Sequence, residues 1–422
     1  MVAVLLTLAA AFAYLNHRFL RLPPTIAMTG MSLALALALA GLGALGLDVS
    51  SEVREFLDQV DFSKFLLEGI LGLLLFAGAL HVDLNDLAEH KWSVGAFATI
   101  GVVGSTAIVG TLTCGISSAL GLGLAPVHCF LFGALISPTD PISVLAILRK
   151  IGAPKSLEVR VAGESLFNDG IGVVVFLTIL SAAGKGTHDG LAEAAILLGQ
   201  EAFGGIALGL LAGWAAYRLI KSIDNYQAEI LLTLALVTGS YALAGAIHVS
   251  GPLATVAAGL LIGNKGRRLA MSQSTRNRLD SFWALIDEIF NAMLFVLIGL
   301  EALVLSLRGQ LLLAGLLAIP AVLFARLVAI GIPVKLLSTF RPFAPKAVRT
   351  IAWAGLRGGI SVALALSLPA SAEWTGPREA ILNMTYLVVV FSILVQGMTI
   401  GRFVQTSEPP DLKTQEQRQR PS

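Results

Sequence analysis

Apolar runs of membrane-spanning length, separated by short polar segments, recur from one end of the chain to the other. A helix needs about 20 predominantly apolar residues to cross a hydrocarbon core of about 30 Å. Joining the short ninth run to its neighbour would give twelve spans. Without that merger we predict thirteen, at residues 2–16, 25–47, 64–81, 93–120, 124–148, 158–182, 190–217, 227–248, 251–263, 283–306, 310–334, 347–370 and 381–404. Either count predicts an all-α polytopic membrane protein.

The two ends of the chain differ in character. The first apolar run has no basic residues before it, whereas His17, Arg18 and Arg21 follow it, so we expect a spanning helix and not a signal peptide. After residue 404 the chain is polar and contains proline. We therefore predict a transmembrane domain at 1–404 and a short disordered cytoplasmic tail at 405–422.

Composition and charge agree with this interpretation. Of the 422 residues, 56% are hydrophobic and only 13% are charged, which is about half the charged share of a soluble domain. Most of the 29 Lys and Arg residues fall in the tail and in connections after odd-numbered spans. The positive-inside rule then predicts an external N-terminus and a cytoplasmic C-terminus. With loops this short, we expect a bacterial inner membrane, no nucleic-acid partner and no cofactor.

The fifth predicted span has prolines on both sides of an acid. It contains Ser137-Pro-Thr-Asp-Pro141 within an otherwise apolar run. Each proline removes a backbone donor and clashes with the preceding turn, so the helix should break here. A break at membrane depth is tolerated only where the backbone is buried in protein or lines a cavity. Thr139 and Asp140 are therefore candidate ion ligands.

The sixth predicted span carries a polar face. Glu164 and Asn168 are four residues apart, as are Ser165 and Asp169, so both pairs lie on one helix surface. An ionisable residue inside a span is costly and is by default a functional hypothesis. Carboxylate, amide and hydroxyl oxygens are the ligands that hard cations prefer. This face predicts a binding site for a monovalent cation.

The twelfth predicted span has an arginine among glycines, in Gly355-Leu-Arg-Gly-Gly359. Interrupted helices in corresponding segments are the best indication of a transport site in a sequence. A buried arginine needs a carboxylate partner. Glu164 and Asp140 are both candidates for the partner of Arg357.

Three further acids stand near the starts of spans. Asp287 and Glu288 begin the tenth span, where they are candidates for a cytoplasmic entrance. Glu68 begins the third span. Each position is equally compatible with a solvated helix end, so we predict only auxiliary roles for them.

Three segments together resemble the signatures of the monovalent cation:proton antiporter family 1, the family of bacterial and eukaryotic Na⁺/H⁺ exchangers. They are Ser-Pro-Thr-Asp-Pro at 137–141, Gly-Glu-Ser-Leu-Phe-Asn-Asp-Gly at 163–170 and Gly-Leu-Arg-Gly-Gly at 355–359. They occur in the family's order, and the resemblance covers the predicted transmembrane domain. It implies the Na⁺/H⁺ antiporter fold, with inverted repeats and two crossed discontinuous helices in the fifth and twelfth spans. It also implies a homodimer.

The resemblance implies roles for individual residues. Asp169 matches the carboxylate that binds the cation or the proton, and Asn168 matches its neutral partner. Thr139 and Ser165 match coordinating oxygens, so that Na⁺ would be held at Asp169, Ser165 and Thr139. Asp140 matches the acid that faces the crossed helix ends.

Two other family features concern acids away from the cation. Glu164 and Arg357 match the family's core ion pair. The family's additional acid in the third span does not align cleanly, because Ala77 stands where an acid is expected. Glu68 is its substitute in this interpretation.

These residues predict a secondary active transporter that exchanges Na⁺, or Li⁺ as its surrogate, for H⁺ by competition at Asp169. Burial penalises the bare carboxylate, so one cation or one proton must neutralise it before it crosses. Electrogenic relatives in the wider superfamily carry a second acid where this chain has Asn168. Because an amide cannot titrate, we predict electroneutral 1:1 exchange, serving sodium transport and pH homeostasis.

Two other functions stay open at this point. A K⁺/H⁺ antiporter could use the same oxygen ligands in a slightly wider cage. An intramembrane aspartyl protease would need two close carboxylates that share a proton, and Asp140 and Asp169 lie on successive spans. The oxygen-rich surroundings and Arg357 favour ion binding, and the chain has no Gly-x-Ser-x-Gly or His-Glu-x-x-His motif. We therefore predict a transporter and not an enzyme.

Overall fold

The structure, a computed structural model, describes residues 2–45, 65–153, 155–185, 191–303, 305, 308–338 and 347–405. The predicted tail from residue 406 onward lies outside these residues. Within them the chain folds into helices and forms no strand. In chain order they are α1 (Val2–Leu15), η1 (Asn16–Leu20), α2 (Pro24–Ala44), η2 (Phe65–Ile70), α5 (Leu71–Leu80), α6 (Leu84–Ala98), α7 (Ile100–Leu120), α8 (Pro126–Leu135), α9 (Ile142–Ile151), α10 (Lys155–Lys185), α11 (Leu191–Ile220), α12 (Tyr226–Ala246), α13 (Gly251–Leu261), η3 (Ile262–Gly266), α14 (Arg267–Leu269), α15 (Gln273–Leu300), η4 (Glu301–Leu303), α16 (Gly309–Leu337), α17 (Ala347–Ala354), α18 (Gly359–Leu366), η5 (Ala372–Trp374), α19 (Thr375–Phe391), η6 (Ser392–Gln396) and α20 (Gly397–Gln405).

The prediction of an all-α membrane protein is confirmed. In the part of the chain that the structure describes, nine helical segments are long and apolar enough to cross a membrane. The other four predicted spans are built differently: α5 and α13 are short, and the remaining two are each divided into two helices, α8 with α9 and α17 with α18. The number of complete crossings is therefore not fixed at thirteen by helix length alone.

The predicted breaks in the fifth and twelfth spans are both present. Residues 136–141 separate α8 from α9, and residues 355–358 separate α17 from α18. The two breaks touch, because the backbone N–H of Asp140 donates to the carbonyl of Leu356 at 2.8 Å in an isolated antiparallel bridge. This contact is the crossing of the two discontinuous helices.

A glycine makes the crossing close enough for this hydrogen bond. A Cβ added at Gly358 would stand 2.7 Å from the Cβ of Asp140, much closer than carbon atoms pack. The φ angle of Gly358 is −130°, which any residue can adopt. The glycine is therefore needed for space and not for backbone freedom.

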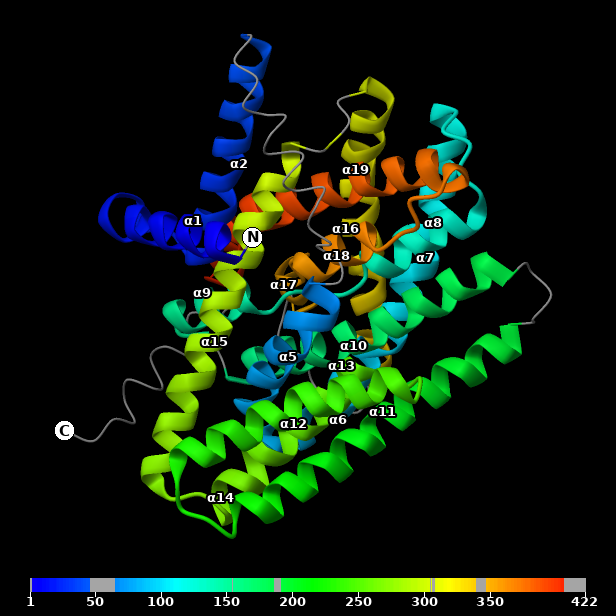
Figure 1. The fold of residues 1–422 in the computed structure, drawn as a ribbon. Helices are drawn as coiled ribbons and strands as arrows, with labels where there is room; N and C mark the ends of the chain where they lie inside the picture. The colour runs from blue at the N-terminus through cyan, green and yellow to red at the C-terminus, as the bar shows by residue number, and fades with distance from the viewer. Residues whose placement is uncertain are drawn as a thin grey trace.

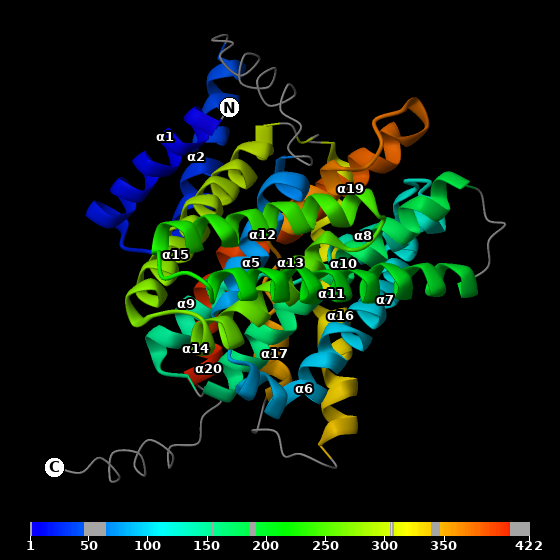
Figure 2. The same ribbon diagram turned by 60° about the horizontal axis from the view of Figure 1, so that its bottom comes forward.

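Helix α10 lies in the middle of the helix bundle. It packs against α6, α8, α11 and α13, and Figures 1 and 2 show it among these helices. Helices α11 and α12 contact each other and run side by side across one face (Figures 1 and 2). The polar face of α10 is therefore enclosed by protein, next to the crossing formed by α8, α9, α17 and α18.

Small residues let α11 and α13 come together. Gly205, Gly209 and Gly213 repeat every four residues along α11, facing the backbone of Ser250, Ala254 and Ala258. A Cβ at Gly209 would collide with the carbonyl of Ala254. Stripes of small residues are the usual way in which membrane helices approach closely.

Candidate functional site

The polar face of α10 is buried as a unit. Glu164, Ser165, Asn168 and Asp169 are 1%, 2%, 0% and 6% exposed. Their spacing of four residues brings them onto one side of the helix, as the sequence predicts. That side faces the break between α8 and α9, since α8 packs against α10.

Thr139, at the break, is held by hydrogen bonds to two residues of α10. Its backbone N–H donates to Oδ1 of Asn168 at 3.3 Å, while Nδ2 of Asn168 donates to Oγ1 of Thr139 at 2.8 Å. The Thr139 hydroxyl also lies 3.0 Å from Oγ of Ser165. The amide of Asn168 thus satisfies a backbone donor that the proline-broken helix leaves unpaired.

Glycine permits this close approach of α10 to the break. A Cβ added at Gly172, one turn beyond Asn168, would collide with the ring of Pro138. The sequence has glycines close to the acids of α10, and the contact with Pro138 explains why one of them stands at position 172. The ring of Pro138 packs directly against Gly172, so a larger residue at position 172 would push the break away from α10.

Asp169 differs from its neighbours in having no fixed partner. No hydrogen bond or ion pair joins its carboxylate to a residue that the structure describes. Its charge is close enough to those of Asp140 and Glu164 to interact with them. A buried carboxylate without a protein partner is costly, and it is available to an incoming cation or proton.

Glu164 pairs with Arg326 and not, as the sequence led us to predict, with Arg357. Nη1 of Arg326 donates to Oε1 of Glu164, and Nη2 donates to Oε2 at 2.9 Å. Arg326 lies on α16 and is 5% exposed. Its approach requires Gly355, where a Cβ would stand 2.5 Å from Nε of Arg326. The prediction failed because Arg326 belongs to no recognisable motif, and only the packing of α16 reveals it.

Arg357 is buried against the break itself. Its Nη1 donates to the carbonyls of Ser137 and Pro138, the latter at 3.0 Å, and its backbone N–H donates to Oγ of Ser392 at 2.9 Å. Arg357 is 2% exposed. The expectation of a carboxylate partner was wrong because the prolines free backbone carbonyls, whose oxygens can solvate a guanidinium.

The chain is similar to known proteins over almost its whole length. A family model described as "Sodium/hydrogen exchanger, transmembrane" matches residues 5–406. The chain belongs to this sodium/hydrogen exchanger family. It is 47% identical over 410 residues to the Na⁺/H⁺ antiporter NhaP of Pseudomonas aeruginosa, covering 96% of each chain. It is 33% identical over 380 residues to the Na⁺/H⁺ antiporter NhaH of Halobacillus dabanensis, covering 89% of this chain and 91% of that one.

A solved structure shares the fold. The sodium proton antiporter MjNhaP1 from Methanocaldococcus jannaschii superposes with a TM-score of 0.74, covering 96% of this chain and 97% of that one. The sequence identity is 22%, so the likeness concerns the fold alone. The predicted Na⁺/H⁺ antiporter fold is thereby confirmed for this sodium/hydrogen exchanger.

Asp287 and Glu288, two of the three acids with predicted auxiliary roles, differ in exposure. Asp287 on α15 is half-buried and receives hydrogen bonds from Nδ2 of Asn291, at 2.8 Å on its carbonyl and 3.0 Å on Oδ1. Asp287 is close enough to Asp140 for their charges to interact. Glu288 is exposed. Glu68 falls in η2, but its side chain lies outside the described residues.

The polar groups at the site are mostly uncharged oxygens and an amide. Among the described residues, no three His, Cys, Asp or Glu side chains gather as a transition-metal site would require. On the same face of α10 as Asp169, the buried polar groups of Ser165 and Asn168 contact the hydroxyl of Thr139. Oxygen ligands with few charges fit a hard cation of low charge.

Proposed function

We propose that this protein exchanges Na⁺ for H⁺ across a bacterial inner membrane, and that Asp169 carries both ions in turn. Membership of the sodium/hydrogen exchanger family supports a transport function. The relatives named above carry the name Na⁺/H⁺ antiporter. The buried oxygen-rich face of α10 supports ion binding at this place in the fold.

The contrast between two acids on α10 carries the proposal. Glu164 accepts a hydrogen bond from each Nη group of Arg326, so its negative charge is already compensated. Asp169, five residues later and 6% exposed, has no such partner among the described residues. A carboxylate that the protein leaves uncompensated needs a mobile cation or a proton. Asp169 is therefore the exchangeable site, and Glu164 is a fixed one.

The oxygens around Asp169 supply the remaining ligands. Thr139 and Ser165 are in contact with each other through their hydroxyls, at 3.0 Å. In our proposal both oxygens turn toward a cation bound at Asp169. Asn168 holds Thr139 in place and is not itself a carrier of charge.

The stoichiometry follows from the number of groups that titrate. Since Asn168 is an amide, one carboxylate accepts either one Na⁺ or one H⁺. Only the neutralised site crosses the membrane at low cost, so each cycle moves one ion in each direction. The exchange is then electroneutral, and an imposed membrane potential leaves its rate unchanged.

The remaining parts of the proposal concern assembly and topology. We place the N-terminus outside and the C-terminus in the cytoplasm, treat residues 1–404 as one transmembrane unit, and propose a homodimer. Labelling of single cysteines introduced at Asn225 and Ser371 with a membrane-impermeant reagent tests the orientation. Cross-linking in the membrane tests the dimer.

Proton-gradient dissipation in everted vesicles tests the function. Vesicles that contain the protein should lose a preformed proton gradient when Na⁺ or Li⁺ is added, and vesicles without it should not. Dissipation by K⁺ at equal or lower concentrations would establish a K⁺/H⁺ antiporter instead. No dissipation by any of the three ions between pH 6 and pH 9 would contradict the proposal.

A further inference from the structure

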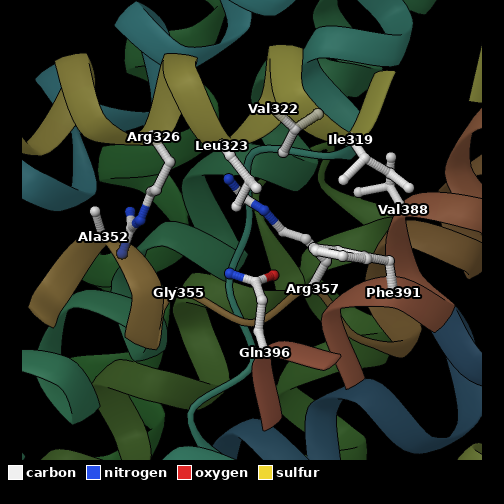
Figure 3. A pocket seen from close by; sticks show the side chains of 10 residues that line it. All are labelled: Ile319, Val322, Leu323, Arg326, Ala352, Gly355, Arg357, Val388, Phe391 and Gln396. Atoms are coloured by element: carbon white, nitrogen blue, oxygen red, sulfur yellow. The ribbon is translucent and has the colours of Figure 1, made fainter. Parts of the chain in front are cut away.

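A small cavity lies beside the helix crossing, next to Gly355 and Arg357. It is enclosed by α16, α17, α19 and η6, and Figure 3 shows the side chains around it. Arg326, Arg357 and Gln396 line it, and its other lining residues are apolar or glycine. The centre of a water-sized particle can occupy about 10 Å³ of it, which is room for about one water molecule or one small ion.

Two charged donors at this cavity lack a partner. Nε of Arg326 and Nη2 of Arg357 are buried and make no hydrogen bond to any residue that the structure describes. The two side chains are 5% and 2% exposed, so bulk water cannot satisfy these N–H groups. Native proteins leave very few buried polar groups unpaired, and each exception calls for an explanation.

Positive charge is in excess at the cavity. Glu164 is the carboxylate partner of Arg326, whereas the guanidinium of Arg357 donates to two carbonyls of the break and forms no ion pair with a residue that the structure describes. The charges of the two arginines act on each other. The residues that line the cavity include two guanidinium groups and no carboxylate, so a small anion in it would be favoured electrostatically.

Gln396 is the side chain with an acceptor oxygen among the residues that line the cavity. The Gln396 amide is already engaged, because its Oε1 accepts from Ser392 at 2.7 Å and its Nε2 donates to the carbonyl of Trp353 at 3.3 Å. A water molecule in the cavity would need acceptors for its own hydrogens. An anion needs only donors, which Arg326 and Arg357 supply.

We propose that this cavity is a binding site for a small monovalent inorganic anion such as chloride, held by Nε–H of Arg326 and Nη2–H of Arg357. The bound anion fixes two arginines that hold Glu164 and the α8–α9 break. Its binding therefore stabilises the helix crossing. The site does not depend on which cation is transported, and its occupancy can be measured without any transport assay.

Anomalous diffraction locates the anion directly. Crystals of the purified protein soaked in bromide should give an anomalous peak between Nε of Arg326 and Nη2 of Arg357. Density for water there, without anomalous signal at saturating bromide, would overturn the proposal. This measurement uses the unaltered protein, so it stands even where a variant fails to fold.

Thermal unfolding of the detergent-solubilised protein gives a second measurement. At constant ionic strength, chloride or bromide should raise the midpoint temperature in a saturable manner, as any ligand of the folded state does. Gluconate and sulfate, which are too large for the cavity, should not. An equal rise with gluconate would show a general salt effect and contradict the site.

A cavity-filling variant distinguishes halide binding in the cavity from halide binding elsewhere on the protein. Ala352 lines the cavity and is 5% exposed. Ala352→Val should remove the halide-dependent rise, because its extra methyl groups occupy the space. The same change at Ala107, an exposed residue of α7, should leave the rise intact. A full halide response in Ala352→Val would contradict the assignment.

Discussion

Glu164 on α10 and Arg326 on α16, 162 residues apart in the sequence, form a two-point ion pair in the buried centre of the protein. Their side chains are 1% and 6% exposed. The pair fixes the position of α10 against α16 and takes one carboxylate out of competition for ions. Asp169 is left as the acid without a fixed partner on the same helix face.

Breaking this pair should destabilise the protein strongly. Arg326→Ala leaves Glu164 buried without its partner, which should lower the free energy of unfolding by about 3–5 kcal/mol. The comparison is Arg308→Ala, since Arg308 pairs with Glu379 at 3.4 Å on the surface. Such exposed pairs contribute about 0–1 kcal/mol. Unfolding in detergent measures both, and equal effects would contradict a structural role for the Glu164–Arg326 pair.

The Thr139 hydroxyl should be needed for cation affinity. Thr139→Val keeps the shape of the side chain but removes the oxygen that contacts Asn168 and Ser165. A lost buried hydrogen-bonding group costs about 1–3 kcal/mol, so the apparent KM for Na⁺ should rise about tenfold or more. Thr178→Val on α10 is the control, because that hydroxyl only bonds back to the carbonyl of Val174. An unchanged KM in Thr139→Val would remove Thr139 from the site.

The crossing should not tolerate a methyl group at Gly358. Gly358→Ala places a Cβ 2.7 Å from that of Asp140, and overpacking of this kind costs about 1–3 kcal/mol. Gly104→Ala on α7 is a matched control with nothing within 4 Å of the added atom. Thermal stability and exchange should fall in the first variant and be kept in the second. Full exchange in Gly358→Ala would mean that the crossing is looser than the structure describes.

Competition at one carboxylate predicts a definite pH dependence. As the pH falls on the side from which Na⁺ enters the site, protons displace the cation. The apparent KM for Na⁺ should then rise by up to about tenfold per pH unit, the limit for one proton. Initial rates in vesicles at several Na⁺ concentrations and pH values give this slope. A steeper rise would require a second titrating group, and a flat profile would rule out shared binding.

Local sequence patterns were enough to predict the broken helices and the polar face of α10. Prolines on both sides of Thr139-Asp140 interrupt a helix in any surroundings, and a spacing of four residues brings side chains onto one face. Both features depend on neighbours along the chain. They are therefore visible before any packing is known.

The partner of Glu164 could not be predicted in the same way. The sequence presents two buried arginines, and the choice between Arg326 and Arg357 depends on how α16 packs against Gly355. Arg357 finds backbone carbonyls that exist only because the helix breaks. Contacts between helices far apart in the sequence carry no local signal. The one available hint was an arginine within the apolar run of 310–334.

Substitution of Asp169 is the most direct test of the central claim. Asp169→Asn keeps the size of the side chain and removes its charge and its proton. In everted vesicles this variant should be present in the membrane at a normal level, and Na⁺ should no longer dissipate a proton gradient. Substantial Na⁺-dependent proton movement by Asp169→Asn would contradict the account, because a second group would then have to carry the ions.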